Sequence, residues 1–590
     1  MSIDFTALTP NIGLNRRQVL RGVTALGTTL LATPGQRRAH PAFEAVPRGR
    51  RVGVFGGGMA GLSAAHELVE RGYEVVVYEP VALGGKSRSI GVLGTGSGGR
   101  ADLPGEHGFR FFPGCYQHVP DTMARIPFPG NVNGVAGNLV RVRAGTWGFD
   151  GLPPVSTPAE PEGIGELTPE TIRNAILTTC TLVPEVPPSE MAFFAGRLMM
   201  WFTMSTERRL GQWEYLSWLD AVQANGKSAA YRNYLARAAT RITVAAKPET
   251  SSARTILTIG EAIILTATGL VPQYQGGVDR VLNAPTNEAW IEPWVTYLRS
   301  CGVRFVPGAG LTRLRLQNGQ ITGAIAGDRW VDTDWYVCAM PAERVADVLD
   351  DAVLEADPRL AGIGELVVDW MTGVQFYLRR PIPVPAGHLA ALGTPWALTA
   401  LCQAPMWRGD FAARYGDGTV AECLSVDVSD WDTPGIIFGK PAKACTRDEV
   451  AQEVWAQLKR WFNTGTDWLH DDNIVSWHID PGIHFDPEAS RNDTPLLVNT
   501  IGSWDHRPEA ACAIPNLFFC GDYIRTNINL ATMEGAIEAG RRAANAILDA
   551  AGDTAARAAI FQLYAPPMLE PLKRIDAERY RAGLPHLWDT

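Results

Sequence analysis

Residues 51–80 place the strongest limit on how this 590-residue chain can fold. The stretch RVGVFGGGMAGLSAAHELVERGYEVVVYEP predicts a buried strand over 52–55, a helix from about Ala60 to Arg71 and a second strand over 73–78. A strand, a short glycine turn, a helix and a strand form the repeating unit of parallel sheets. We therefore expect an α/β domain built on a parallel sheet.

The glycines of this unit have the spacing G-x-G-x-x-G, with Gly56, Gly58 and Gly61 in the three glycine positions. Gly56 allows the tight turn, Gly58 lets the backbone approach a pyrophosphate, and Gly61 lets the helix lie close to the strand. Glu79 ends the second strand, where its carboxylate can accept hydrogen bonds from ribose hydroxyls and would repel a 2′-phosphate. The positive end of the helix faces the diphosphate. Together these features predict a Rossmann-type dinucleotide site.

Three further motifs resemble the FAD-dependent amine oxidase and phytoene desaturase superfamily. LGGKSRS follows the acidic strand end at 83–89, PNLFFCGD lies at 515–522, and NLATMEGAIEAG lies at 529–540. The resemblance implies a glutathione-reductase-like FAD domain and an interleaved α+β substrate domain with an antiparallel sheet and a helical part. It also implies that Asp522 holds the ribityl chain or diphosphate and that the Met533 N–H meets the flavin pyrimidine. A helix N-terminus there would stabilise the negative charge of reduced flavin.

The cofactor expected from this resemblance is FAD, and no metal is expected. The segment GEHGFRFFPG at 105–114 takes the place of the family's glycine loop over the flavin ring, and a strand residue at 311 is the candidate for adenine packing. The predicted cofactor-binding residues are Gly56, Gly58, Met59, Ala60, Gly61, Glu79, Gly84, Gly85, Lys86, Gly108, Phe109, Arg110, Leu311, Gly521, Asp522, Thr532 and Met533. The catalytic acid or base is not identified, and the candidates are His107, Arg110 and Tyr523.

The length and the motif positions together suggest several segments. A chain of 590 residues with 46% hydrophobic residues can bury a large core and is expected to divide into at least two domains. We predict a leader over 1–45, FAD-binding parts over 50–150, 273–360 and 501–550, a helical substrate-covering region over 151–272, a substrate-binding antiparallel region over 361–500, and a tail over 551–590.

Charge and cysteine content exclude some classes of protein. A net charge of −9 and a pI near 5.7 give no electrostatic reason to expect a nucleic-acid partner. The nine cysteines show no C-x-x-C spacing, and their odd number excludes a fully paired set within one chain. We expect them to be mostly buried thiols.

The first 45 residues raise the question of export. NRRQVLR at 15–21 precedes an apolar run over 22–32, which resembles a twin-arginine signal. The segment 33–40 offers no clean A-x-A cleavage site, so a disordered basic leader on a cytoplasmic protein is the alternative. Export would make the protein periplasmic, extracellular or membrane-associated. Any membrane contact would be peripheral, since no segment approaches 18 uninterrupted apolar residues.

The residues expected near the flavin ring bear on which branch of the superfamily the chain resembles. Amine oxidases commonly place a lysine near flavin N5, on the strand leading to the aromatic pair matched here by Phe376-Tyr377. This chain has Thr372-Gly373 there, and no lysine between Lys247 and Lys440. The motif at 107–116 and the segment from Gly387-His388 to Trp407 instead resemble plant-type phytoene and zeta-carotene desaturases and hydroxysqualene dehydroxylases.

We therefore expect hydride transfer between an apolar, isoprenoid-like substrate and flavin N5, acting on a CH–CH bond. Such a substrate offers little charge to bind, so a dry tunnel would have to position it. The electron acceptor, a quinone or oxygen, leaves no motif. The alternatives are an amine or L-amino-acid oxidase that releases hydrogen peroxide, and a non-redox flavoprotein that acts as an isomerase or binding protein.

Overall fold

The computed structural model describes residues 49–108, 110–159, 165–238, 240–241, 245–274, 276–486 and 488–589. The predicted leader over 1–45 and Phe109 lie outside these residues. Residues Val46–Thr590 belong to one compact unit. The finer boundaries expected within it remain predictions. The segment 151–272 begins with a strand of the larger sheet, β7 (Leu152–Pro158), before its helices.

A five-stranded parallel sheet carries the glycine motif. Its order is β23 (Leu517–Phe519), β13 (Trp335–Cys338), β1 (Arg51–Phe55), β2 (Glu74–Glu79) and β9 (Arg304–Pro307). Strands β1 and β2 come from the start of the chain and β23 from near its end, with β13 between β23 and β1. This arrangement confirms the predicted α/β fold. A three-stranded antiparallel sheet follows β9: β10 (Leu311–Gln317), β11 (Gln320–Ala326) and β12 (Arg329–Val331).

The second large sheet has seven strands and is mostly antiparallel. Its order is β19 (Ile474–Ile479), β15 (Thr372–Leu378), β18 (Glu422–Val428), β17 (Leu398–Cys402), β16 (His388–Ala391), β6 (Ala144–Phe149) and β7, with only β16 and β6 parallel. Alternate residues of a strand point to opposite faces. On β15 and β18, Phe376 and Leu424 belong to the apolar core that includes α14 (Arg447–Phe462), whereas Gln375 and Ser425 face away from it.

Four short antiparallel pairs complete the strands of the described residues: β3 (Ser89–Val92) with β4 (Leu103–Glu106), β5 (Leu139–Arg141) with β8 (Arg280–Leu282), β14 (Val368–Asp369) with β22 (Leu496–Leu497), and β20 (Ile483–His484) with β21 (Arg491–Asn492). The pair β3–β4 leads directly into the loop expected over the flavin.

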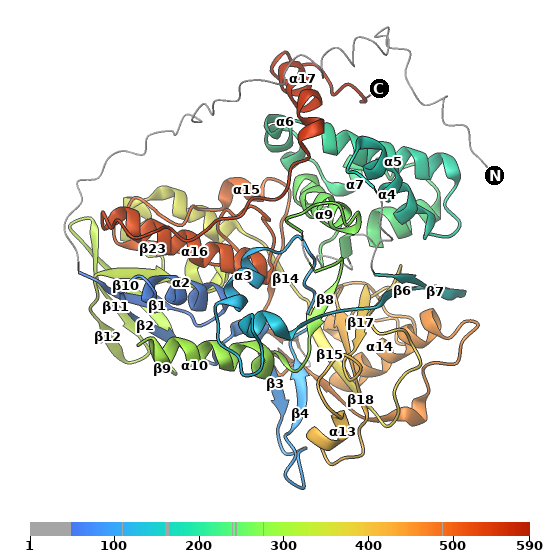
Figure 1. Cartoon of the computed structure of the whole chain (residues 1–590), viewed down its shortest axis with the longest axis horizontal. Coiled ribbons are helices and arrows are strands. Elements are labelled where there is room, and N and C mark those ends of the chain that lie inside the picture. The colour runs from blue at the N-terminus through green and yellow to red at the C-terminus, as the bar shows by residue number, and fades with distance from the viewer. Residues whose placement is uncertain are drawn as a thin grey trace. The chain divides into compact units, whose positions relative to one another are not determined.

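The helices fall into two groups. Those beside the parallel sheet are α2 (Met59–Val69), α3 (His118–Ala124), α10 (Glu292–Ser300) and α16 (Met533–Ala550). A mainly helical region contains α4 (Pro169–Thr181), α5 (Pro188–Thr203), α6 (Thr206–Gly211), α7 (Trp218–Ala221), α9 (Ala253–Ala267) and α17 (Glu570–Arg581), as Figure 1 shows. Shorter helices are α11 (Ala342–Ala346), α12 (Asp351–Ala356), α13 (Phe411–Arg414) and α15 (Ser503–His506). No helix of the described residues is long and apolar enough to cross a bilayer.

Candidate cofactor and active site

The two distant motifs meet through the helices that follow them. Helix α2, after the glycine turn, packs on α16, which begins after the Gly-Asp motif (Figure 1). The hydroxyl of Ser63 donates to Ile537 O at 2.9 Å. A Cβ built on Gly540 would lie 2.4 Å from Ala60 O, so this glycine permits the close approach of the helices. The structure therefore brings together two sites separated by more than 450 residues of sequence.

The glycine turn crosses the second glycine motif at backbone contact. Gly84 N donates to Gly57 O at 2.8 Å, and Gly56 has φ +115°. A Cβ on Gly61 would lie only 1.9 Å from Gly56 O, so the fold itself requires glycine there. Gly58 differs: the nearest atom to an added Cβ is Gly85 Cα at 3.9 Å, and its φ of −75° suits any residue. The space beside Gly58 is therefore open to a ligand.

The first turn of α2 offers donors to that space. Its N-cap is Gly58, which supplies no side-chain cap, and the first turn contains no acidic residue. By contrast, Thr446 and Glu449 cap α14 reciprocally. The first N–H groups of α2, at Met59 and Ala60, have no intrahelical acceptors and suit a phosphate.

Glu79 closes the nucleotide end of this site. Its Oε2 accepts from Gly57 N at 2.7 Å, and its Oε1 accepts from Val81 N at 2.8 Å. An ionised carboxylate has about four acceptor positions, so it can still accept from a ribose hydroxyl. Ala309 N donates to Glu79 O at 3.2 Å, which places the start of β10, and hence buried Leu311, beside the acid.

The opposite end of the site lies between β23 and α16. Asp522 is half-buried, and within the described part of the chain its carboxylate makes no hydrogen bond or ion pair. The N-cap of α16 is Thr532, whose Oγ1 accepts from Gly535 N at 3.0 Å. Glu534 is turned away to α3, where it accepts from His118 N at 2.8 Å. The Met533 N–H at the helix start therefore has no intrahelical acceptor.

These features fit FAD. The open space at Gly58, the free first turn of α2, the acceptor at Glu79, the unpartnered carboxylate of Asp522 and the free start of α16 match the donors and acceptors that a flavin dinucleotide needs. When bound, FAD supplies a two-electron acceptor. The protein supplies the groups that hold and orient it.

The loop after β4 is held on the polar face of the seven-stranded sheet. Gln375 Nε2 donates to Glu106 O at 2.9 Å, and Gly373 N donates to His107 O at 2.7 Å. A Cβ on Gly108 would lie 2.7 Å from Asp427 Oδ1. The Gln375 side chain and the Gly373 N–H thus hold the backbone at the start of this loop on the sheet.

His107 and Tyr523 both contact other groups of the protein. The Nδ1 atom of His107 contacts the Asp480 carboxylate, and both side chains are buried. Burial alone would raise the pKa of Asp480, but the hydrogen bond and charge of His107 lower it. Tyr523 donates to Cys338 O at 3.0 Å, and burial raises its pKa well above the usual value.

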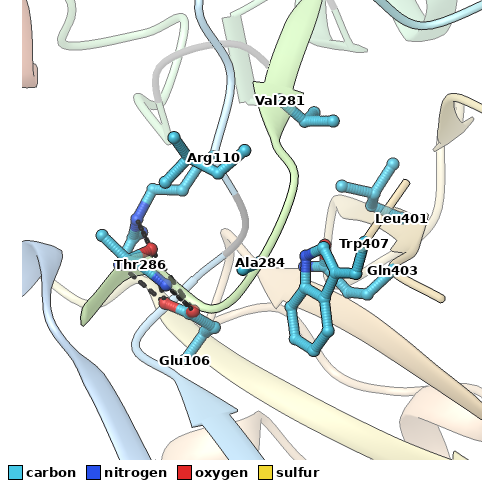
Figure 2. A pocket seen from close by; sticks show the side chains of 9 residues that line it. Glu106, Arg110, Val281, Ala284, Thr286, Leu401, Gln403 and Trp407 are labelled. Atoms are coloured by element: carbon cyan, nitrogen blue, oxygen red, sulfur yellow. Dashed lines mark hydrogen bonds and ion pairs between the residues drawn. The ribbon is translucent and has the colours of Figure 1, made fainter. Parts of the chain in front are cut away.

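Arg110 belongs to a small cavity with one polar and one apolar wall (Figure 2). The cavity volume is about 10 Å³, which is about the space of one water molecule. On the polar wall, Arg110 Nη2 donates to Glu106 Oε2 at 3.1 Å, and Thr286 N donates to Glu106 Oε1 at 3.0 Å. The remaining lining residues are Val281, Leu282, Ala284, Leu401, Gln403 and Trp407. The charges of the polar wall are neutralised within the protein.

A family model for flavin-containing amine oxidoreductases matches residues 59–548. The chain belongs to this family. Zeta-carotene desaturase from the cyanobacterium Synechocystis sp. is 24% identical over 535 residues, covering 84% of this chain and 97% of that protein. Putrescine oxidase bound to putrescine has a TM-score of 0.56 at 14% identity, covering 85% of this chain and 99% of the other. Cyclohexylamine oxidase from Brevibacterium oxydans has a TM-score of 0.51 at 13% identity, covering 85% and 99%. These two structures show the fold, and the family implies FAD.

Most of the predicted cofactor residues belong to the two motifs that the fold joins, while Gly108 and Arg110 lie in the loop after β4 and Leu311 begins β10. Phe109 lies outside the described residues. Lys86 uses its Nζ to contact Pro495 O, so its side chain ties the crossing loop to a distant segment. Sequence reasoning missed Asp480, Thr286 and Arg507. Asp480 follows β19 directly and precedes Pro481-Gly482, a turn signal that could have pointed to it, but nothing in the sequence marks Arg507 as buried.

Proposed function

We propose that this protein is an FAD-dependent dehydrogenase or desaturase that removes hydride from an apolar, isoprenoid-like substrate. The observation that carries the proposal is the backbone at Thr372-Gly373, where amine oxidases commonly place lysine. A Cβ on Gly373 would lie 2.7 Å from Glu106 O, so the loop occupies the space that a longer side chain would need. This site therefore does not use the amine-oxidase lysine.

The walls of the cavity also favour a substrate without charge. Glu106 accepts from Arg110 Nη2, Thr286 N and Ser89 Oγ, and Arg110 Nη1 also donates to Gly108 O at 2.8 Å. Neither charge is free to bind an ammonium or carboxylate group. Val281, Leu401 and Trp407 offer apolar contact instead.

The 24% identity to zeta-carotene desaturase over 97% of that protein supports the same class. In such a reaction FAD, held by the glycine motifs and the Gly-Asp loop, would supply the acceptor for a hydride from one substrate carbon, and a base of the protein or solvent would take the proton from the neighbouring carbon. The electron acceptor would be a quinone or oxygen. A peripheral membrane contact would give access to an apolar substrate, and export through the leader remains part of the proposal.

Anaerobic mixing of the holoprotein with candidate substrates tests the proposal. We expect zeta-carotene, phytoene or squalene-derived alcohols to bleach the flavin absorbance, and a panel of primary amines and L-amino acids to leave it unchanged. Bleaching by amines, with hydrogen peroxide released in air, would favour the oxidase alternative suggested by the fold of putrescine oxidase. Tight binding of an isoprenoid without bleaching would favour a non-redox role. Mass spectrometry of co-purified lipid would identify the occupant directly.

A further inference from the structure

Arg507 lies directly behind the Gly-Asp loop of the flavin site. It follows α15, and its segment runs beside the loop: Arg525 N donates to Pro508 O at 3.0 Å, and Phe519 N donates to Ala510 O at 2.9 Å. The Arg507 side chain is 2% exposed. A guanidinium is rarely buried this completely unless it is paired.

Among the described residues, no carboxylate lies close enough to Arg507 to form an ion pair. Nη1 donates to Asp522 O at 2.7 Å and to Ile524 O at 3.3 Å. Nε and Nη2 make no hydrogen bond to any described residue. The nearby Glu214 is already taken by Arg254, at 2.7 Å. Burial lowers the pKa of Arg507 to about 10, and the negative charge of Asp522 offsets only part of this effect.

The hydrogen bonds of Arg507 fix the direction of one peptide unit. In a trans peptide the C=O and the N–H point in opposite directions. Because Asp522 O points to Arg507, the Tyr523 N–H points away from it. That N–H makes no backbone hydrogen bond within the described residues. The Tyr523 N–H is therefore oriented by Arg507 through the Asp522 carbonyl, and it has no acceptor among the described residues.

We propose that Arg507 is a positioning residue for the FAD diphosphate, which it serves by orienting the Asp522–Tyr523 peptide and by placing a buried positive charge behind it. The inference rests on FAD binding and not on the proposed substrate. A neutral donor could make the two carbonyl bonds without the burial cost, so the charge needs a further partner. An anion bound on the far side of the loop would offset that cost, since Coulomb attraction is strong where water is excluded. Asp522, with its free carboxylate on the same loop, would accept hydroxyl groups of the cofactor.

Binding of three probes to the flavin-free protein tests the proposal. FAD and ADP carry a diphosphate and riboflavin carries none, so each is titrated into wild-type protein, Arg507→Met and Arg507→Lys. We expect Arg507→Met to weaken FAD and ADP by similar factors, roughly 10-fold to 100-fold, within the usual range of coupling between sites. Riboflavin affinity should stay within about 2-fold, and Arg507→Lys should recover much of the loss because it keeps the charge.

Arg525→Gln is the matched control. Arg525 is an arginine near the same loop and donates to Trp504 O at 3.2 Å, but it is only half-buried. It should leave all three affinities near wild type. The proposal is overturned if Arg507→Met binds FAD, ADP and riboflavin equally weakly and its flavin-free form melts at a lower temperature, because that result shows a merely structural role. It is also overturned if Arg507→Met binds FAD as tightly as wild type. If Arg507→Met does not fold, Arg507→Lys decides. A folded Arg507→Lys protein that does not measurably bind FAD would refute the role of charge. None of these readouts needs the substrate.

Discussion

Gly58 and Gly61 occupy the same motif, but the structure gives them different tasks. A Cβ on Gly58 meets nothing of the protein closer than 3.9 Å, whereas a Cβ on Gly61 would lie 1.9 Å from a backbone oxygen. Alanine at position 58 should therefore weaken only the binding of a ligand in the open space beside it. Alanine at position 61 should disturb the fold.

The magnitudes follow from these contacts. Gly58→Ala changes an N-cap glycine with ordinary backbone angles, which costs about 1 kcal/mol of stability or less. Losing one charge-assisted hydrogen bond to the phosphate costs about 1.5–3 kcal/mol, which corresponds to roughly 10-fold to 150-fold weaker FAD binding. Gly61→Ala must displace the Gly56 carbonyl, and such overpacking costs about 1–3 kcal/mol or more.

FAD titration and thermal melting of the flavin-free proteins separate the two effects. Gly58→Ala should melt within a few degrees of wild type and bind FAD weakly, whereas Gly61→Ala should lose both properties or fail to fold. Normal FAD affinity in Gly58→Ala would show that no phosphate passes Gly58. A melting temperature as low as that of Gly61→Ala would show that the fold, and not a ligand, requires this glycine.

Three other variants probe the site and its supports. Glu79→Ala should sharply lower FAD occupancy, measured as visible flavin absorbance relative to protein absorbance, because it removes the ribose acceptor and the partner of Gly57 N; full occupancy would refute that role. Burial raises the pKa of Glu422 to about 7, so the free energy of unfolding should fall by about 3 kcal/mol as pH rises from about 4.5 to about 7. Glu422→Gln should remove this pH dependence, measured by melting at several pH values, and an unchanged pH dependence would contradict the reasoning. His107 lowers the pKa of Asp480, so the stability that Asp480 contributes is present above about pH 4 and is lost as pH falls. Asp480→Asn should therefore lose less stability on acidification than wild type, and identical acid unfolding of the two proteins would refute the pairing.

The nucleotide half of the site was predictable because steric rules act within a few residues of sequence. The expected strands over 52–55 and 73–78 match β1 and β2 to within one residue at each end, and the expected helix overlaps α2. Most cysteines are buried as free thiols, as expected. The meeting of the two motifs was predicted only through family resemblance, because no local pattern tells which distant segment packs on α2.

The parts that sequence reasoning missed depend on contacts across the fold. The partner of His107 is Asp480, which lies 373 residues further along the chain, so no local pattern predicts their contact. Arg507 is an extreme case, because arginine is normally exposed and only the three-dimensional structure shows a buried guanidinium bonded to the loop of Asp522. Local motifs thus indicate where a cofactor touches the backbone, whereas the groups that fix the electrostatics of that backbone come from segments without a motif. For this chain, the search for residues that control the flavin should begin behind the Gly-Asp loop.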